Sequence, residues 1–192
     1  AHRGVDPGAH VATLMGKSAA LVVALLGIWR RGAVHVPLFT AFASPAIAFR
    51  LEASAAKIVI ADRDQVAKLA PGTDIPADVP WRVIVAGSGD AADIGRDVLD
   101  FAALLAAHGA DEPGGQAVAV GSGGRLVQLF TSGTTGTPKG VVALHRGLTA
   151  LFRSHRADLY VPTQARAGRD RLRVGHAWSF AFDASWQPQL WL

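Results

Sequence analysis

The chain has 192 residues, a length that fits one or two domains, and half of its residues are hydrophobic, which excludes a disordered protein. It contains no cysteine, so disulfides and thiolate metal sites are excluded, and its seven histidines lack the paired spacing of a zinc site. The formal net charge of +4 suits an anionic ligand, but it fits an arginine-rich surface equally well.

The first forty residues predict a strand, a buried helix and a second strand. Two short apolar runs, HVATLM (10–15) and AVHVPL (33–38), flank the stretch SAALVVALLGIW (18–29), which is apolar on all sides. Ser18 can cap the start of this helix, Gly32 can end it, and two arginines before Gly32 suit the negative end of its dipole. The run is too short to cross a membrane, and we interpret it as a buried helix rather than a signal-peptide core.

The alternation of strands and helices continues along the chain. Helices are predicted at 46–54, 62–70 and 96–108, and strands at 57–61, 81–87 and 125–130. Short apolar strands that alternate with helices are typical of a mostly parallel sheet covered on both faces. The sequence therefore predicts an α/β fold of layered, mostly parallel sheets flanked by helices. The glycine-rich stretch 109–124 is interpreted as a linker or long surface loop, and so as a possible subdomain junction.

The stretch LFTSGTTGTPKGV (129–141) joins the last of these strands to another apolar run. Its glycines let backbone N–H groups approach a ligand, and its hydroxyls and single lysine are suited to phosphate. It is not a Walker A loop, because Lys139 lies between Pro138 and Gly140 and no serine or threonine follows to bind magnesium. The alternative interpretation is a plain hairpin loop between the two apolar runs.

The ten residues TSGTTGTPKG (131–140) resemble, without a gap, the signature loop of the adenylate-forming superfamily. That superfamily includes nonribosomal peptide synthetase adenylation domains, acyl-CoA synthetases and luciferases, and the resemblance extends over essentially the whole chain. It implies part of an N-terminal core domain, with ATP and a carboxylate as substrates and an acyl-adenylate and pyrophosphate as products. It also implies that the ATP phosphates are held by Thr131, Ser132, Gly133, Thr134, Thr135, Gly136 and Lys139.

The back half of the chain favours amino-acid activation. HRGL (145–148) follows the loop as in peptide synthetase adenylation domains, and apolar residues at helical spacing up to position 155 predict a core-facing helix. RLRVGHAWSFAFDAS (171–185) alternates bulky and small side chains, which predicts a strand with one open face. Asp183 has the parity of that face, and FDAS resembles the segment whose aspartate pairs with a substrate α-ammonium, with Ala184 beside it in the pocket. Alternatively, Asp183 or Ser185 caps a following helix.

The front half favours a different branch of the superfamily. The stretch FTAFASPAIAFRLEASAAKIVIAD (39–62) resembles acetyl-CoA synthetase-type acyl-CoA ligases. The chain is therefore interpreted either as a natural intermediate subfamily or as a chimera of the two branches. We favour amino-acid activation because the pocket-side residues lie in the back half, and an acyl-CoA synthetase is the alternative.

Several parts that the resemblance implies have no match in this sequence: the magnesium-binding acid, the ribose-binding aspartate and the C-terminal domain with its catalytic lysine. We therefore expect a fragment with no catalytic residue or metal ligand of its own and no pyrophosphate exchange when isolated; a non-catalytic remnant is an alternative. The implied cofactors are ATP and Mg²⁺, and the implied partners are a small carboxylate and the thiol of a carrier-protein phosphopantetheine or of CoA. We expect a cytoplasmic protein with no membrane partner. Sparse aromatic residues in the arginine-rich stretch 146–173 argue against a nucleic-acid partner.

Overall fold

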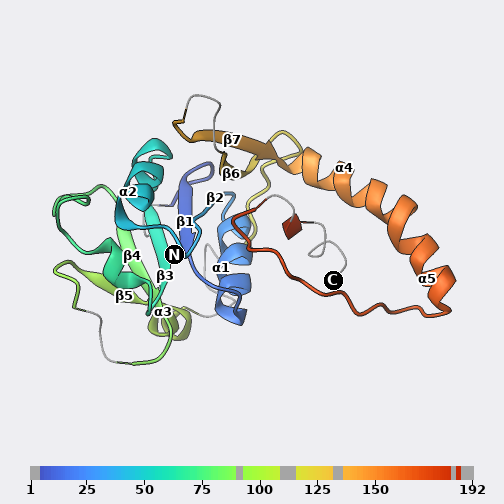
Figure 1. Ribbon diagram of the computed structural model, residues 1–192, viewed down its shortest axis with the longest axis horizontal. Helices are drawn as coiled ribbons and strands as arrows, with labels where there is room; N and C mark the ends of the chain where they lie inside the picture. Colours follow the sequence, from blue (N-terminus) through green and yellow to red (C-terminus); the bar gives the residue numbers. More distant parts are fainter. Residues whose placement is uncertain (1–4, 90–92, 109–115, 132–135, 183–184, 187–192) are drawn as a thin grey trace.

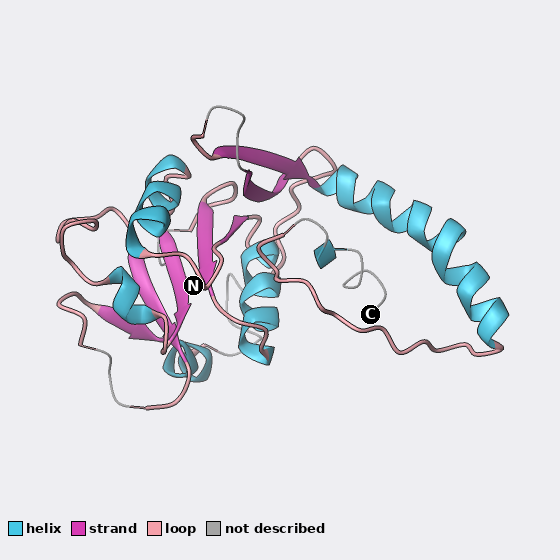
Figure 2. Ribbon diagram, in the orientation of Figure 1, coloured by secondary structure: helices cyan, strands magenta, loops and turns pink. Residues whose placement is uncertain are grey.

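The computed structural model describes residues 5–89, 93–108, 116–131, 136–182 and 185–186. In this part of the chain the central feature is a seven-stranded sheet with the order β5-β4-β3-β1-β2-β6-β7 (Figures 1 and 2). The strands are β1 (His10–Leu14), β2 (Val34–Pro37), β3 (Ile58–Asp62), β4 (Arg82–Ala86), β5 (Val98–Asp100), β6 (Arg125–Thr131) and β7 (Lys139–Leu144). Neighbouring strands are parallel except β6 and β7, which are antiparallel. The predicted mostly parallel α/β fold is confirmed.

Helices cover both faces of this sheet. They are α1 (Ala19–Arg30), α2 (Ser44–Ala53), the 3₁₀ turn η1 (Val66–Leu69), α3 (Phe101–Ala107), α4 (His145–His155), the π-helical turn η2 (Arg156–Tyr160) and α5 (Val161–Ala167). Along β3, Ile58 and Ile60 pack with α1, while Val59 and Ala61 pack on the other face with α2 and η1. A period of two with both faces apolar is what a strand covered on both sides requires.

The predicted β-α-β unit at the start of the chain is confirmed, with one correction. The Ser18 hydroxyl accepts a hydrogen bond from the Leu21 amide at 3.1 Å, so Ser18 caps α1 as expected. Gly32 follows the helix with φ +67, a left-handed conformation that glycine adopts without strain. The helix is not buried all round: Val22 and Leu26, four residues apart, are 46% and 59% exposed, so one side of α1 is open to solvent.

The predicted helix at 96–108 begins later than expected. Val98–Asp100 form β5, which pairs with β4, and the helix starts at Phe101. The physical reason is the cap: the Asp100 carboxylate accepts a hydrogen bond from the Ala103 amide at 2.6 Å, which fixes Asp100 as the residue before the first turn.

The helix predicted after the loop is present, but it does not face the core. The elements α4, η2 and α5 follow one another as an arm that points away from the sheet (Figure 1), and none of their residues is buried. Phe152 is 39% exposed and contacts only the ring of Tyr160 among the described aromatic residues, 6.4 Å away. The spacing of apolar residues gave the helix correctly. The spacing alone could not predict burial, because burial requires a second surface that packs against the helix.

Within the described residues, no helix is long and apolar enough to cross a bilayer.

The strand predicted at 171–185 is not formed by the described residues of that segment. Residues 171–178 are irregular, and a turn follows in which the Phe182 amide donates to the Ser179 carbonyl at 3.1 Å. A strand needs a neighbour for its N–H and C=O groups, and no described strand lies alongside this segment. The argument that placed Asp183 on the open face of a strand therefore no longer holds. Asp183 itself lies outside the described residues.

Candidate functional site

The candidate site lies at one edge of the sheet, where the parallel strands end. Because β1, β2, β3 and β6 run in the same direction, their carboxyl ends meet at this edge. The order β2-β1-β3-β4-β5 is that of flavodoxin-like sheets, in which ligands bind outside the carboxyl ends of the strands. Lys17, Thr40, Asp62 and Thr131 all lie at or just after such an end.

The phosphate-loop candidate is the connection of the β6–β7 hairpin. Thr131 and Lys139 are direct partners in the antiparallel register, and both are exposed. Residues in that relation place their side chains on the same face of the sheet, with Cβ atoms about 5 Å apart. A hydroxyl and an ammonium side by side at the mouth of a loop fit a phosphate group. Gly136 has φ +81, a backbone conformation that glycine tolerates.

The structure therefore brings together two of the seven residues predicted to hold phosphate, with Gly136 close to them in sequence. Ser132, Gly133, Thr134 and Thr135 lie outside the described residues, so their predicted role is untested. The hairpin interpretation of this segment is confirmed. It is compatible with phosphate binding, since the hairpin is what places Thr131 opposite Lys139.

An aromatic cluster under α2 holds the end of β6 that leads into the loop. The guanidinium of Arg50 lies 4.1 Å from the ring centre of Phe42 and 5.7 Å from that of Phe130, which directly precedes Thr131. Arg50 also donates to the Ala46 carbonyl at 2.8 Å and is only 9% exposed. Burial lowers the pKa of the Arg50 guanidinium. The Arg50 guanidinium thus lies over both rings and, through Phe130, links the end of β6 to α2.

The same cluster reaches the segment predicted to line the substrate pocket. The ring of Phe39 lies 5.8 Å from that of Phe42 and 5.8 Å from that of Phe182. Contacts thus run from Phe182, through Phe39 and Phe42, to Arg50 and the loop-bearing strand. The two segments that sequence reasoning assigned to phosphate and to substrate are joined at the carboxyl edge of the sheet.

Asp183 and Ala184 follow Phe182 directly but lie outside the described residues, so their predicted contact with substrate is untested. The residues after them are anchored: Ser185 is fully buried and its amide donates to the Phe182 carbonyl at 3.1 Å. The ring of Trp186 lies 5.6 Å from that of Trp29 in α1.

Two polar residues at the edge were not singled out from the sequence. The Asp62 carboxylate accepts a hydrogen bond from the Gly16 amide at 2.7 Å, which ties the end of β3 to the end of β1. Burial raises the pKa of Asp62, and the nearby charge of Asp64 raises it further, while the Gly16 hydrogen bond opposes both. Lys17 donates to two carbonyls of the segment before Phe182. The sequence signal that could have identified Asp62 and Lys17 was their position just after a predicted strand.

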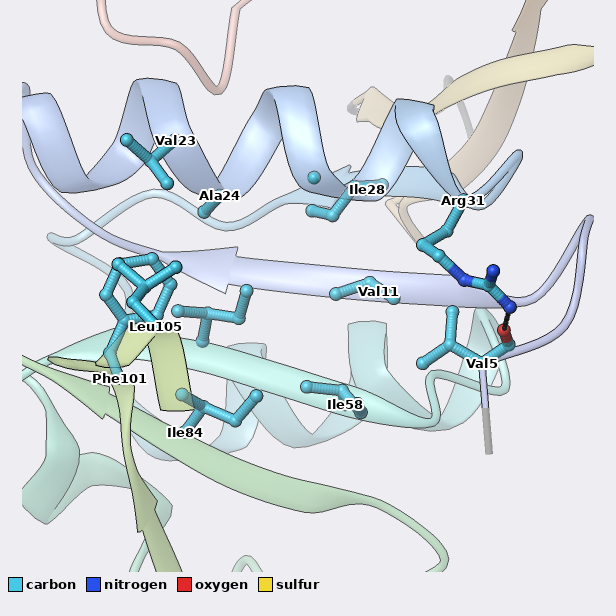
Figure 3. Close-up of a pocket in the computed structure, with 12 residues that line it drawn as sticks. Val5, Val11, Val23, Ala24, Ile28, Arg31, Ile58, Ile84, Phe101 and Leu105 are labelled. Carbon is cyan, nitrogen blue, oxygen red and sulfur yellow. Dashed lines mark hydrogen bonds between the residues drawn. The ribbon is translucent and has the colours of Figure 1, made fainter. Parts of the chain in front are cut away.

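A hollow lies away from this edge of the sheet, between α1 and α3. It has a volume of about 260 Å³. Figure 3 shows Val23 and Leu105 on either side of it, above Ile58 of the sheet. Apart from Arg31, which donates to the Val5 carbonyl at 3.4 Å, its described lining side chains are apolar. It lacks the hydroxyls and paired charges that a nucleotide needs, so the strand ends are the better candidate site.

Comparison with known proteins decides the family. Residues 1–192 match the family described as AMP-binding enzyme. The chain belongs to the AMP-binding enzymes. It is 38% identical over 149 residues to the long-chain-fatty-acid–CoA ligase FadD13 of Mycobacterium tuberculosis, covering 76% of this chain and 26% of FadD13. It is 33% identical over 193 residues to the isonitrile lipopeptide synthase of the same species, covering 96% of this chain and 6% of that protein.

Among solved structures, the acyl-CoA synthetase of Brucella canis matches with a TM-score of 0.66 and 34% identity, covering 80% of this chain and 26% of that one. The predicted family and its fold are thereby confirmed for this chain. The AMP-binding chain spans about a quarter or less of the length of these relatives. Because an acyl-CoA ligase and a lipopeptide synthase both match, family membership leaves the substrate open.

Proposed function

We propose that this chain is part of an enzyme that activates an amino acid at the expense of ATP and passes it to a carrier-protein thiol. A carboxylate oxygen attacks the α-phosphorus of ATP, pyrophosphate leaves, and the acyl-adenylate forms. The phosphopantetheine sulfur then attacks the acyl carbon and AMP leaves. The observation that carries the proposal is the pairing of Thr131 with Lys139 at the carboxyl edge of the sheet.

The loop residues act by binding and orientation. The Lys139 ammonium forms a charge-assisted contact with phosphate, and the Thr131 hydroxyl donates a hydrogen bond beside it. Backbone N–H groups of the loop glycines complete the cradle. Mg²⁺, when bound with ATP, would neutralise part of the phosphate charge. Holding the reacting groups in line is the main means by which such sites accelerate transfer at phosphorus.

The nucleotide part of the proposal is tested by Lys139→Ala in an enzyme that joins this chain to the remainder of its domain. Loss of a charge-assisted contact worth about 1.5–3 kcal/mol lowers ATP affinity or the exchange rate about ten- to a hundred-fold. Lys57→Ala is the matched control, because Lys57 is an exposed lysine just before β3, at the opposite edge of the sheet. ATP-dependent pyrophosphate exchange and calorimetric ATP titration are measured for both. Equal effects of the two substitutions would refute the role of Lys139.

The substrate part of the proposal concerns Asp183, which directly follows Phe182 of the joined site. An α-ammonium that enters a partly desolvated pocket needs a counter-charge, and removing one partner of such a pair costs about 3–5 kcal/mol. Asp183→Ala is therefore expected to lower amino-acid affinity or turnover by roughly a hundred- to several-thousand-fold. Exchange rates are compared for an amino acid and its desamino analogue, in the wild type and in the variant.

The second candidate function is an acyl-CoA ligase, supported by the identity to FadD13. A plain carboxylic acid has no ammonium, so this function needs no counter-charge at position 183. Amino-acid activation predicts that the wild type prefers the amino form and that the preference collapses in Asp183→Ala. A wild type that prefers the desamino acid, or a preference that survives the substitution, would instead establish the ligase alternative.

A further inference from the structure

Lys17 connects two parts of the chain that are far apart in sequence but meet at the carboxyl edge of the sheet. Its ammonium donates to the carbonyl of His176 at 2.8 Å and to that of Ala177 at 3.1 Å. We propose that Lys17 is a positioning residue that fastens segment 176–182 to the end of β1. The inference rests on the proposed function, because it assigns Lys17 a part in seating the carboxylate substrate.

The backbone that carries Lys17 is fixed on both sides. On one side, the Gly16 amide is bound to the Asp62 carboxylate at 2.7 Å. On the other, the Ser18 hydroxyl caps α1 through the Leu21 amide at 3.1 Å. Lys17 therefore extends from a rigid turn between a buried strand and a capped helix. Because this turn has few alternative conformations, little backbone entropy is lost when the Lys17 side chain binds the distant segment.

The segment on the other side is not held by backbone pairing with the described strands of the sheet. Residues 171–178 form no ladder with a described strand, so backbone pairing does not place them. A cavity of about 230 Å³ separates the segment from the strand ends. It is lined by Met15, Gly16, Lys17, Phe39 and Thr40 on the sheet side and by Ala177, Ser179 and Phe180 on the segment side. Apolar packing is incomplete across this space, and the two bonds of Lys17 bridge it.

The bonded carbonyls lie at the point where the segment turns toward the site. The His176 ring stacks on Phe180 with centroids 4.8 Å apart and planes inclined by 11°, and Phe180 packs against the core beside α1. The turn at Ser179 and the contact of Phe182 with Phe39 follow. Fixing the carbonyls of residues 176 and 177 therefore helps to set the path of the chain up to Phe182.

The variant Lys17→Met keeps the length of the side chain and removes its hydrogen bonds, whereas Lys17→Arg keeps a cation with several donors. Each is made in the enzyme that joins this chain to the rest of its domain, with Lys57→Met as the matched control. For Lys17→Met we expect the KM for the carboxylate substrate to rise about tenfold, with the KM for ATP nearly unchanged, because the two charge-assisted bonds that are lost hold segment 176–182 and not the β6–β7 hairpin. Lys17→Arg is expected to recover most of the loss.

A second readout is independent of activity. Arg173 is exposed just before the fastened segment, so the rate at which trypsin releases a peptide beginning at Val174, followed by mass spectrometry, reports whether the segment is held. Faster cleavage and a raised carboxylate KM in Lys17→Met alone support the proposal. Unchanged cleavage, or faster cleavage with an unchanged carboxylate KM, overturns it. If the wild type activates no carboxylate, the proposed function fails, and the cleavage rate alone decides whether Lys17 fastens the segment.

Discussion

Residues 10–86 and residues 125–186 contain apolar side chains at similarly regular spacing, but they bury them to very different extents. Among the described residues, every buried hydrophobic side chain except Leu126 and Val127 lies at or before Ala86. In the later region Val141 is 52% exposed, and no residue of α4 or α5 is buried. The early region is a core covered on both faces, while the later one is a hairpin, an arm and a returning segment.

The difference shows which structural features a periodic pattern of apolar residues determines. In the early region each strand is followed by a helix that packs back onto the same sheet, so the partner of each apolar face is close in the chain. In the later region the period produces α4, but no described element lies over its apolar stripe. The predicted binding residues follow the opposite trend, because all the residues predicted to hold phosphate or substrate belong to the later part of the sequence. Loops placed on a rigid scaffold are the usual location for such residues.

The largest effect on stability is expected in the early core. Leu51 of α2 is 1% exposed and packs between η1 and the sheet. Leu51→Ala removes buried methyl groups and leaves a cavity, and is expected to lower the free energy of unfolding by about 2–5 kcal/mol. Urea unfolding of the 192-residue chain, followed by far-ultraviolet circular dichroism, measures it. A loss below about 1 kcal/mol would mean that the early region is not the close-packed core that its burial indicates.

Acid is expected to weaken the same core through His35. This side chain is 1% exposed on β2, and the Thr13 hydroxyl lies 2.8 Å from its Nε2. Burial lowers the pKa of His35 to about 3 in the folded protein, against 6.5 when unfolded. Between these values only the unfolded chain takes up the proton, so stability is fully present above pH 6.5 and falls by about 1.4 kcal/mol per pH unit below it, or about 2 kcal/mol at pH 5.

The measurement for His35 is the pH dependence of urea unfolding from pH 7 to pH 4.5, in the wild type and in His35→Gln. Carboxylates and His10 titrate in both proteins, so the difference between the two slopes isolates His35. The wild type should lose stability more steeply than the variant. Parallel slopes would show that His35 is not held neutral by burial.

A smaller effect on stability is expected at the N-cap of α1. Ser18 is exposed but caps the helix through the Leu21 amide, and Ser18→Ala is expected to cost about 1 kcal/mol of stability. Ser18→Gly, which costs only a few tenths of a kcal/mol at such positions, is the control for the backbone conformation. A Ser18→Ala variant that unfolds at the same urea concentration as the wild type would show that the hydroxyl does not act as a cap.

Local chemistry made much of this structure predictable. Ser18 and Gly32 mark the ends of α1 because capping and left-handed backbone are decided by the residue and its immediate neighbours. The late start of α3 was missed because Asp100, its cap, lies inside an apolar pattern that suits a strand and a helix alike. At the candidate site, the loop and its Lys139 were predicted from the resemblance of ten contiguous residues to a family signature, and their contact with phosphate stays a prediction. The bonds from Lys17 were not predicted, because no local pattern reports a partner 159 residues away.

The smallest expected effect on stability lies in the arm formed by α4, η2 and α5. It compares the early and later regions most directly. Leu151 of α4 is a helical leucine like Leu51, but it is only half-buried, and α4 has no buried residue. Leu151→Ala therefore removes little contact and exchanges leucine for the best helix former, so a change below about 1 kcal/mol is expected. Urea unfolding of the same 192-residue chain measures Leu51→Ala and Leu151→Ala side by side. A loss for Leu151→Ala as large as that for Leu51→Ala would mean that the apolar stripe of α4 is covered in solution, by its own chain or by a second copy. Dependence of that loss on protein concentration would identify the second copy.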